Sequence, residues 1–182
     1  YMVEYLDLCV GRVLDAVQQA GIAENTLVVF LSDQGGSRTN GYGRTLWERS
    51  LKVVCNAIWP GQIAPNTRAT KPWVHYDLYA TFAALAGAQV PDDRTIDAQN
   101  VWPLFQGKEQ PLDRRLHWTY RNEDAVREGD LKLHVTDGTP DGLFDLSSDP
   151  EEKLDLRTTT SEKVKEMMAK HHVWKQECET QQ

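Results

Sequence analysis

The sequence predicts an α/β protein in two parts: a layered region over residues 1–90, then a small antiparallel sheet with a terminal helix over residues 91–182. Three observations support this prediction. Helical patterns alternate with apolar runs in the first part, and short runs separated by tight turns fill the second. The last stretch repeats apolar residues at helical spacing.

The first part has the pattern of a helix, two strands and a second helix. Residues 1–20 carry a helical apolar stripe that Gly21 is suited to end. The run "NTLVVFLS" at 25–32 is rich in β-branched residues, which favours a strand covered on both faces, as in a parallel sheet. A second apolar run occupies 51–59, and residues 73–87 again have helical spacing and end in glycine.

The second part predicts a meander of short strands followed by a helix. The strands are expected at 115–120, 124–128, 131–135 and 142–146, with a hairpin bend at Glu128-Gly129-Asp130. The helix is predicted to begin at Thr159, with Glu162 completing a capping box. Its apolar stripe consists of Val164, Met167, Met168, His171 and Trp174.

Composition excludes several classes of partner. The chain has 182 residues, 26% of them charged, with a net charge of −7. It has no cluster of Lys and Arg, so we expect no nucleic-acid partner. No apolar run approaches the length of a membrane span. Because Tyr1 already falls within a helical pattern, we expect the protein to start earlier.

Asp33 and Gln34 stand where the first predicted strand ends in a glycine loop. Ligands gather at the carboxyl ends of strands in α/β sheets, and carboxylate and amide oxygens suit Ca²⁺ or Mg²⁺. Gly35 and Gly36 would let the backbone turn sharply beside an anionic group. The alternative is an Asx-type turn. Spacing alone favours the turn, because calcium takes about 6–8 oxygens and this stretch offers two side chains.

The order of six segments changes the balance between these alternatives. The segments are "NTLVVFLSDQGG", "TLWERSLKV", "WPGQI", "HYDLYATFAALAG", "AVREGDLKL" and "GLFDLSSDPEEKLDL". In this order they resemble the C-terminal half of a type I sulfatase, a family of the alkaline phosphatase superfamily. The resemblance implies that residues 1–90 are the C-terminal part of an alkaline phosphatase-like layered sheet. It also implies that Asp33 and Gln34 bind the Ca²⁺ that holds the sulfate group.

The sequence departs from the family at a sulfate contact. The family places a lysine three residues before the Leu of the segment around Glu48, and that position here is Gly43. Arg44 could supply the cation instead, since a planar guanidinium suits a sulfate face, or it could be a solvated loop charge. The loop between Gln34 and Arg44 is also short for the family.

The family's nucleophile is a formylglycine made from Cys or Ser in a Cys/Ser-x-Pro/Ala-x-Arg motif. Cys9, Cys55 and Cys178 do not fit this motif, and they give no zinc or disulfide framework. Ser148 has a proline at the right offset, but Glu152 stands where the arginine is needed. We therefore expect the formylglycine, and the remaining calcium ligands, upstream of this chain. No catalytic residue is assigned within the chain.

Three expectations follow for the chain alone. It should not hydrolyse aryl sulfates, because no residue can become formylglycine. It should bind calcium weakly or not at all, because two ligands are too few. It should self-associate or aggregate through residues 26–32 and 52–58, since an uncovered apolar strand edge is a template for pairing.

The histidines and hairpin charges have simpler interpretations. We interpret His75 as mainly structural, with a weaker alternative as a substrate-cleft residue. The adjacent His171 and His172 point to different faces of a helix, which makes a metal site there improbable. His117 and His134 fall within strands, with no paired ligand apparent in the sequence. The charges at Arg127, Asp130 and Lys132 are interpreted as hairpin charges, although the resemblance places this hairpin near the substrate entrance.

The function implied by the resemblance is sulfuric ester hydrolysis by the intact protein, on a sulfated small molecule or glycan. One alternative is a phosphodiesterase or phosphonate hydrolase of the same superfamily. Another is a non-catalytic binding module derived from a sulfatase, which the missing lysine would favour. The sequence carries no compartment signal; the resemblance is compatible with a periplasmic or secreted protein.

Overall fold

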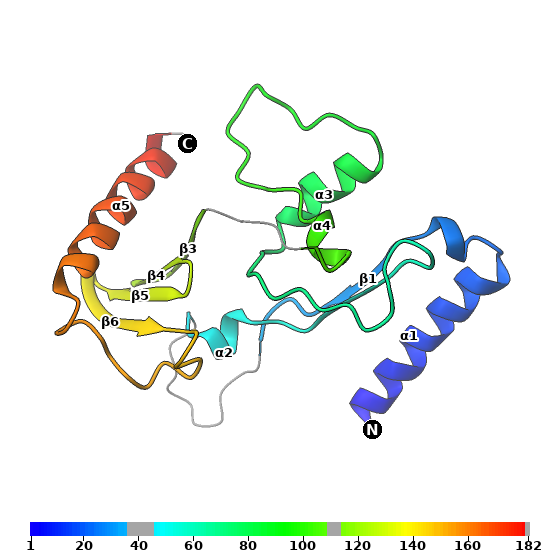
Figure 1. Cartoon of the computed structure of the whole chain (residues 1–182), viewed down its shortest axis with the longest axis horizontal. Helices are drawn as coiled ribbons and strands as arrows, with labels where there is room; N and C mark the ends of the chain where they lie inside the picture. The colour runs from blue at the N-terminus through cyan, green and yellow to red at the C-terminus, as the bar shows by residue number, and fades with distance from the viewer. Residues whose placement is uncertain (36–45, 109–113, 181–182) are drawn as a thin grey trace. The chain divides into compact units, whose positions relative to one another are not determined.

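The computed structural model of the protein describes residues 1–35, 46–108 and 114–180 (Figure 1). The chain divides into two compact units, Tyr1–Leu31 with Cys55–Leu112 and Ser32–Val54 with Asp113–Gln182. Each unit buries its own cluster of apolar side chains. The architecture is mixed α/β with antiparallel sheets and a terminal helix, which confirms the fold class at this level.

The first unit combines helices with a two-stranded sheet. It contains helix α1 (Met2–Gln19), the 3-10 helix η1 (Ala23–Asn25), strands β1 (Val28–Leu31) and β2 (Cys55–Ile58), and helices α3 (Asp77–Leu85) and α4 (Trp102–Phe105). The buried core comes from α4 and the residue before it. Val101, Leu104 and Phe105 form that core, and partly buried Val29, Ala57 and Leu78 pack against it from β1, β2 and α3.

Glycine ends both longer helices of the first unit, as the sequence predicts. Gly21 and Gly87 have positive φ values of 69° and 67°. After α3, the amide of Gly87 donates to Ala84 O at 3.2 Å and that of Ala88 to Ala83 O at 2.8 Å. This pair of bonds is a Schellman motif, which requires a left-handed residue that glycine adopts without a steric penalty.

Strand β1 differs from the expectation in its pairing direction. Its described partner is β2, and the two run antiparallel, with Val28 opposite Ile58 and Leu31 opposite Cys55. The parallel arrangement favoured by the apolar run is therefore wrong for this pair. A continuous apolar run indicates that a strand is buried on both faces, but it does not predict whether the neighbouring strand runs parallel or antiparallel.

The apolar stripe of α1 forms a helix but is not buried. Every residue of α1 keeps part of its surface exposed, including Leu6 at 50% and Val13 at 56%. The side chains of β1 are half-buried, so α1 exposes more of its apolar side chains than this strand does. Self-association of the chain stays a prediction. Neither α1 nor any other helix of the described residues has the length and hydropathy needed to cross a lipid bilayer.

The second unit is built on a four-stranded meander. It contains helix α2 (Glu48–Leu51), strands β3 (Arg115–Tyr120), β4 (Glu123–Glu128), β5 (Leu131–Thr136) and β6 (Thr139–Asp145), and helix α5 (Ser161–Thr180). The strands pair antiparallel in chain order. Glu128 pairs with Leu131, so Gly129 and Asp130 form a two-residue turn, which confirms the predicted hairpin.

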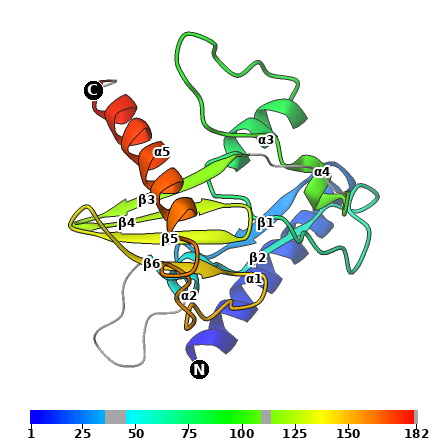
Figure 2. The ribbon, with the colours of Figure 1, turned by 60° about the vertical axis from the view of Figure 1, so that its left-hand side comes forward.

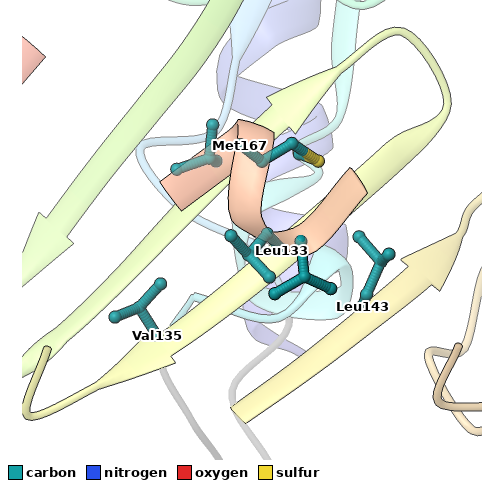
Figure 3. Close-up of a cluster of buried hydrophobic side chains, with 6 residues drawn as sticks. Leu133, Val135, Leu143 and Met167 are labelled. Carbon is teal, nitrogen blue, oxygen red and sulfur yellow. The ribbon is translucent and has the colours of Figure 1, made fainter. Parts of the chain in front are cut away.

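Helix α5 covers one face of this sheet (Figure 2). Leu133 and Val135 of β5 and Leu143 of β6 meet Met167 of α5 in a buried apolar cluster (Figure 3). The predicted stripe of α5 is confirmed, since Val164, Met167 and His171 are buried and the other two members are half-buried. Side chains alternate along a strand, so Lys132 and His134, on either side of Leu133, face the other side of the sheet.

The start of α5 corrects the predicted capping box. The helix begins at Ser161, and the hydroxyls of Thr159 and Thr160 both donate to Leu156 O, at 3.1 and 2.7 Å. Glu162 lies 2.8 Å from Lys165 on the exposed side of the helix. Threonine hydroxyls can bond to carbonyls three or four residues back as well as cap a helix, and a run of such residues does not tell which occurs.

Candidate functional site

The Asp33–Gln34 loop follows directly from the end of β1. The amide of Ser32 donates to Val54 O at 3.0 Å. Asp33 and Gln34 are exposed, and the amide of Gln34 donates to Asp33 Oδ1 at 2.8 Å. The hydroxyl of Ser32 donates to Gln34 O at 2.6 Å. The loop thus has local side-chain contacts typical of a turn, and it presents a carboxylate and an amide to solvent.

Gly35 fixes this loop against the end of helix α2. Its amide donates to Ser50 O at 2.7 Å. A Cβ atom at this position would lie 2.6 Å from Lys52 O and closer still to Arg49 O. Only glycine therefore allows the loop to lie against these carbonyl groups. The loop and helix α2 are therefore in direct contact at Gly35.

The first turn of α2 is held by a buried carboxylate. The amide of Glu48 donates to Glu152 Oε2 at 2.7 Å. The Lys132 ammonium lies 2.9 Å from Glu152 Oε1 and 3.3 Å from Glu48 Oε1. The side chains of Lys132 and Glu152 are 0% and 1% exposed. Buried charges of this kind must be paired and hydrogen-bonded, and here one lysine bridges two carboxylates.

Arg127 and His134 complete the group. Arg127 Nη1 lies 3.3 Å from Glu48 Oε2, and its Nε donates to Gly129 O at 2.9 Å. His134 Nε2 lies 2.7 Å from Glu152 Oε1. Burial alone would raise the pKa of Glu152, but the contact with His134, the charge of Lys132 and the Glu48 amide together hold this pKa below its usual value. We call Glu48, Arg127, Lys132, His134 and Glu152 the α2 charge cluster.

This cluster corrects the interpretation of the hairpin charges. Lys132 and Arg127 are buried or nearly so and pair with Glu48, whereas Asp130 is 67% exposed and behaves as a hairpin charge. His134, for which the sequence showed no partner, contacts Glu152. The sequence analysis missed Glu152, whose partners Glu48 and Lys132 lie far from it in the sequence. The available signal was the alternation of Lys132 and His134 with the apolar residues of β5.

A second group of polar residues joins α5 to the sheet. His117 Nδ1 lies 3.3 Å from His171 Nδ1, and the His117 ring stacks on Trp174 with centroids 4.4 Å apart. Asp124 Oδ2 lies 3.2 Å from His171 Nε2 and 2.9 Å from Lys175 Nζ. Burial, then the electrostatic influence of His171 and of the Arg115 guanidinium, lower the pKa of His117 to about 4. These contacts hold a helix in place.

The described residues do not test the other candidate residues of this site. Arg44 and Gly43 lie outside the described residues. His75 is exposed before α3 in the first unit, and a substrate role for it stays a prediction. The neighbouring Asp77 is fully buried and accepts the amides of Val74 and Gln99 at 2.8 and 2.9 Å. Asp77 therefore has a structural role.

Two observations bear on cofactors. Among the residues that the structure describes, no group of three or more His, Cys, Asp or Glu could hold a metal ion by itself. Cys9 and Cys55 are half-buried free thiols, and Cys178 is exposed. Burial raises the pKa of the Cys55 thiol, which disfavours a reactive thiolate there.

Comparison with known proteins relates most of the chain to one group. A family model described as sulfatase matches residues 1–88. Steryl-sulfatase of Mus musculus is 30% identical to this chain over an alignment that is 215 residues long. The alignment covers 91% of this chain and 34% of that protein. The crystal structure of Ps i-CgsB superimposes with a TM-score of 0.82 and 28% identity over 95% of this chain and 41% of that one.

A third similarity is to a solved structure that shares the fold. Phosphonate monoester hydrolase of Agrobacterium radiobacter matches with a TM-score of 0.64 and 22% identity, over 93% of this chain and 40% of that one. At this identity the likeness concerns the fold alone. The chain thus spans roughly a third to two fifths of its relatives. The family match and the relatives that cover both units agree: this chain belongs to the sulfatase family, within the alkaline phosphatase superfamily.

Proposed function

We propose that the intact protein hydrolyses sulfuric esters and that Asp33 and Gln34 contribute to its metal site. The observation that carries the proposal is the match of a steryl-sulfatase to 91% of the chain. The loop is suited to the role because it follows a strand end, where ligands gather in α/β folds, and because its two oxygen-bearing side chains are exposed.

The donor set fits calcium, the ion that the family implies. A carboxylate and an amide oxygen are hard ligands of the kind that Ca²⁺ prefers. Asp33 Oδ1 accepts the Gln34 amide, while among the described residues Oδ2 accepts no hydrogen bond. When bound, calcium would polarise the sulfate oxygens and offset charge that develops on them. The remaining ligands and the formylglycine are proposed to lie outside this chain.

Within this proposal, the residues of the chain hold ligands and carry out no covalent step. Gly35 allows the loop to lie against the α2 carbonyl groups, and the hydroxyl of Ser32 holds the backbone of Gln34. The chain alone is therefore expected to be inactive on aryl sulfates and to bind calcium weakly. Arg44 stays a candidate for the sulfate contact that a lysine makes in the family.

The substrate is proposed to be a sulfated small molecule or glycan. One relative is named a steryl-sulfatase, and Ps i-CgsB has been solved in complex with k-i-k-neocarrahexaose. These two ligand types differ in size and polarity, and both relatives match this chain at 28–30% identity. The proposal therefore specifies the sulfuric ester bond that is cleaved and does not choose between these two types of substrate.

The test uses the longer protein that contains this chain, with an aryl sulfate and an aryl phosphonate ester as substrates. We expect sulfate hydrolysis in the presence of calcium, and a loss of roughly 100-fold or more in Asp33→Ala. Asp93→Asn is the matched control, because Asp93 is an exposed carboxylate that pairs with Arg94 in the first unit. Preferential turnover of the phosphonate ester would favour the superfamily alternative. Turnover of neither substrate would favour a binding module.

A further inference from the structure

The α2 charge cluster occupies the face of the sheet opposite α5, and nothing in the proposed reaction requires it. It contains two carboxylates, two permanent cations and a histidine, brought together from four segments of the second unit. Its lysine is 0% exposed. Charges are expensive to bury, and an apolar pair of similar volume would often stabilise a fold as well. Such a cluster is therefore better explained by what it positions than by stability.

A short path of direct contacts leads from this cluster to the candidate ligands. Glu152 accepts the first amide of α2, at Glu48. The carbonyl groups of Arg49 and Ser50 in this four-residue helix, and of Lys52 directly after it, lie around Gly35. Gly35 follows Asp33 and Gln34 in the chain. A shift of α2 would therefore move the loop, because the tight contact at Gly35 leaves no space to absorb it.

We propose that Glu152 and Lys132 are positioning residues, which fix α2 and through it the Asp33–Gln34 loop. The ligand role of that loop rests on the proposed function. The positioning itself is a property of the second unit and can be tested without activity. The two oxygens of the Glu152 carboxylate have different partners. Oε2 accepts the α2 amide, while Oε1 is held by Lys132 at 2.9 Å and His134 at 2.7 Å.

The backbone around Glu152 supports a role in positioning. Glu152 has a φ of 56°, in the left-handed region that non-glycine residues seldom adopt. The turn is held by Asp149, whose Oδ2 accepts the amides of Lys153 at 2.8 Å and Leu154 at 2.7 Å. Strained backbone persists where surrounding contacts determine it, and such places are frequently functional. Here the turn directs the Glu152 side chain into the cluster.

Asp155 provides a matched control in the same segment. It is a carboxylate that accepts the backbone amide of Leu143 at 3.1 Å and pairs with Arg157 at 2.7 Å. It resembles Glu152 in accepting an amide and facing a cation. In the structure its contacts lie within the sheet and the segment after it, and they do not include α2. Asp155→Asn therefore removes an interaction of similar chemistry without affecting the proposed path, at a side chain that is 35% exposed where that of Glu152 is 1% exposed.

The experiment measures amide hydrogen exchange by NMR in the chain and in Glu152→Gln and Asp155→Asn. The reporters are the amides of Gly35 and Lys52, which donate to Ser50 O and Glu48 O. The measured quantity is the exchange rate of each reporter amide divided by that of the Leu133 amide. We expect Glu152→Gln to raise this ratio roughly tenfold or more, and Asp155→Asn to change it less than about twofold. Equal changes in both variants, or an unchanged Gly35 amide, would overturn the proposal. Should Glu152→Gln not fold, Glu152→Asp keeps the charge, shortens the reach and is judged by the same ratio.

A second measurement separates this inference from the proposed function. In the longer protein, Glu152→Gln is expected to raise the calcium concentration needed for half-maximal sulfatase activity roughly tenfold or more, with Asp155→Asn close to wild type. An unchanged calcium dependence would overturn the link to the ligands. A wild-type protein without sulfatase activity would refute the proposed function, and the exchange ratio at Gly35 would still decide whether α2 is positioned by Glu152.

Discussion

The two faces of the second unit's sheet are buried in opposite ways. On one face, Leu133 and Val135 pack against α5 through apolar contacts. On the other, Lys132 and His134 of the same strand pair with carboxylates from distant segments. Apolar burial is non-directional and chiefly stabilises, whereas buried charge pairs require a defined geometry. The comparison indicates that one face holds the unit together and the other sets the position of α2.

The largest effect is expected on the charged face, for Lys132→Met. This change leaves the buried carboxylates of Glu48 and Glu152 without their common cation, and breaking such a pair costs about 4 kcal/mol of unfolding free energy. Urea unfolding of the chain measures the loss. The matched control is Lys165→Met, at an exposed lysine of α5. A loss below about 1 kcal/mol would show that the charged face contributes little to stability.

The next effect is expected on the apolar face, for Leu133→Ala. Leu133 is fully buried in the cluster with Met167, and removing it leaves a cavity at a cost of about 3 kcal/mol. The same urea experiment applies. Unlike Glu152→Gln, this variant should leave the exchange of the Gly35 amide, relative to global unfolding, unchanged. A selective effect at Gly35 would contradict the division of roles between the two faces.

A smaller effect on the stability of the fold is expected as the pH falls, through the histidines that join α5 to the sheet. The pKa of His117 is lowered from 6.5 to about 4 by burial and by His171 and Arg115, while Asp124 opposes this shift. Because the folded state favours the neutral ring, the unfolded state takes up the proton first. Stability is therefore full above about pH 6.5 and is lost as the pH falls towards 4.

Thermal unfolding between pH 7 and 4 measures this effect. His117→Phe keeps an aromatic ring beside Trp174 and removes the titrating group, so its melting temperature should fall less over this range than that of the wild type. His75→Gln is the control, because His75 is exposed in the other unit. Equal slopes for the wild type and His117→Phe would contradict the assignment.

Sequence reasoning located the elements better than their partners. Local patterns were sufficient for the helix ended by Gly21, the hairpin at Gly129 and the stripe of α5, because each depends on neighbouring residues. The burial of Lys132 depended on Glu48, which is 84 residues away, and no local pattern encodes such a pair. The pairing direction of β1 was missed for the same reason. The metal role of Asp33 came from the order of segments and stays a prediction.

The smallest effect is expected for Glu162→Gln, and it isolates what burial contributes. Glu162 lies 2.8 Å from Lys165, a distance almost the same as the 2.9 Å between Lys132 and Glu152. The two pairs differ in environment, because the α5 side chains are 85% and 72% exposed. Water and ions screen such a pair, so the melting temperature should change by less than about 1 °C. A predicted capping box at Thr159 would instead make Glu162 important for the start of α5. A drop of several degrees in melting temperature, together with faster amide exchange in the first turn of α5, would support that capping box. It would also weaken the conclusion that the contribution of a charge pair depends more on burial than on distance.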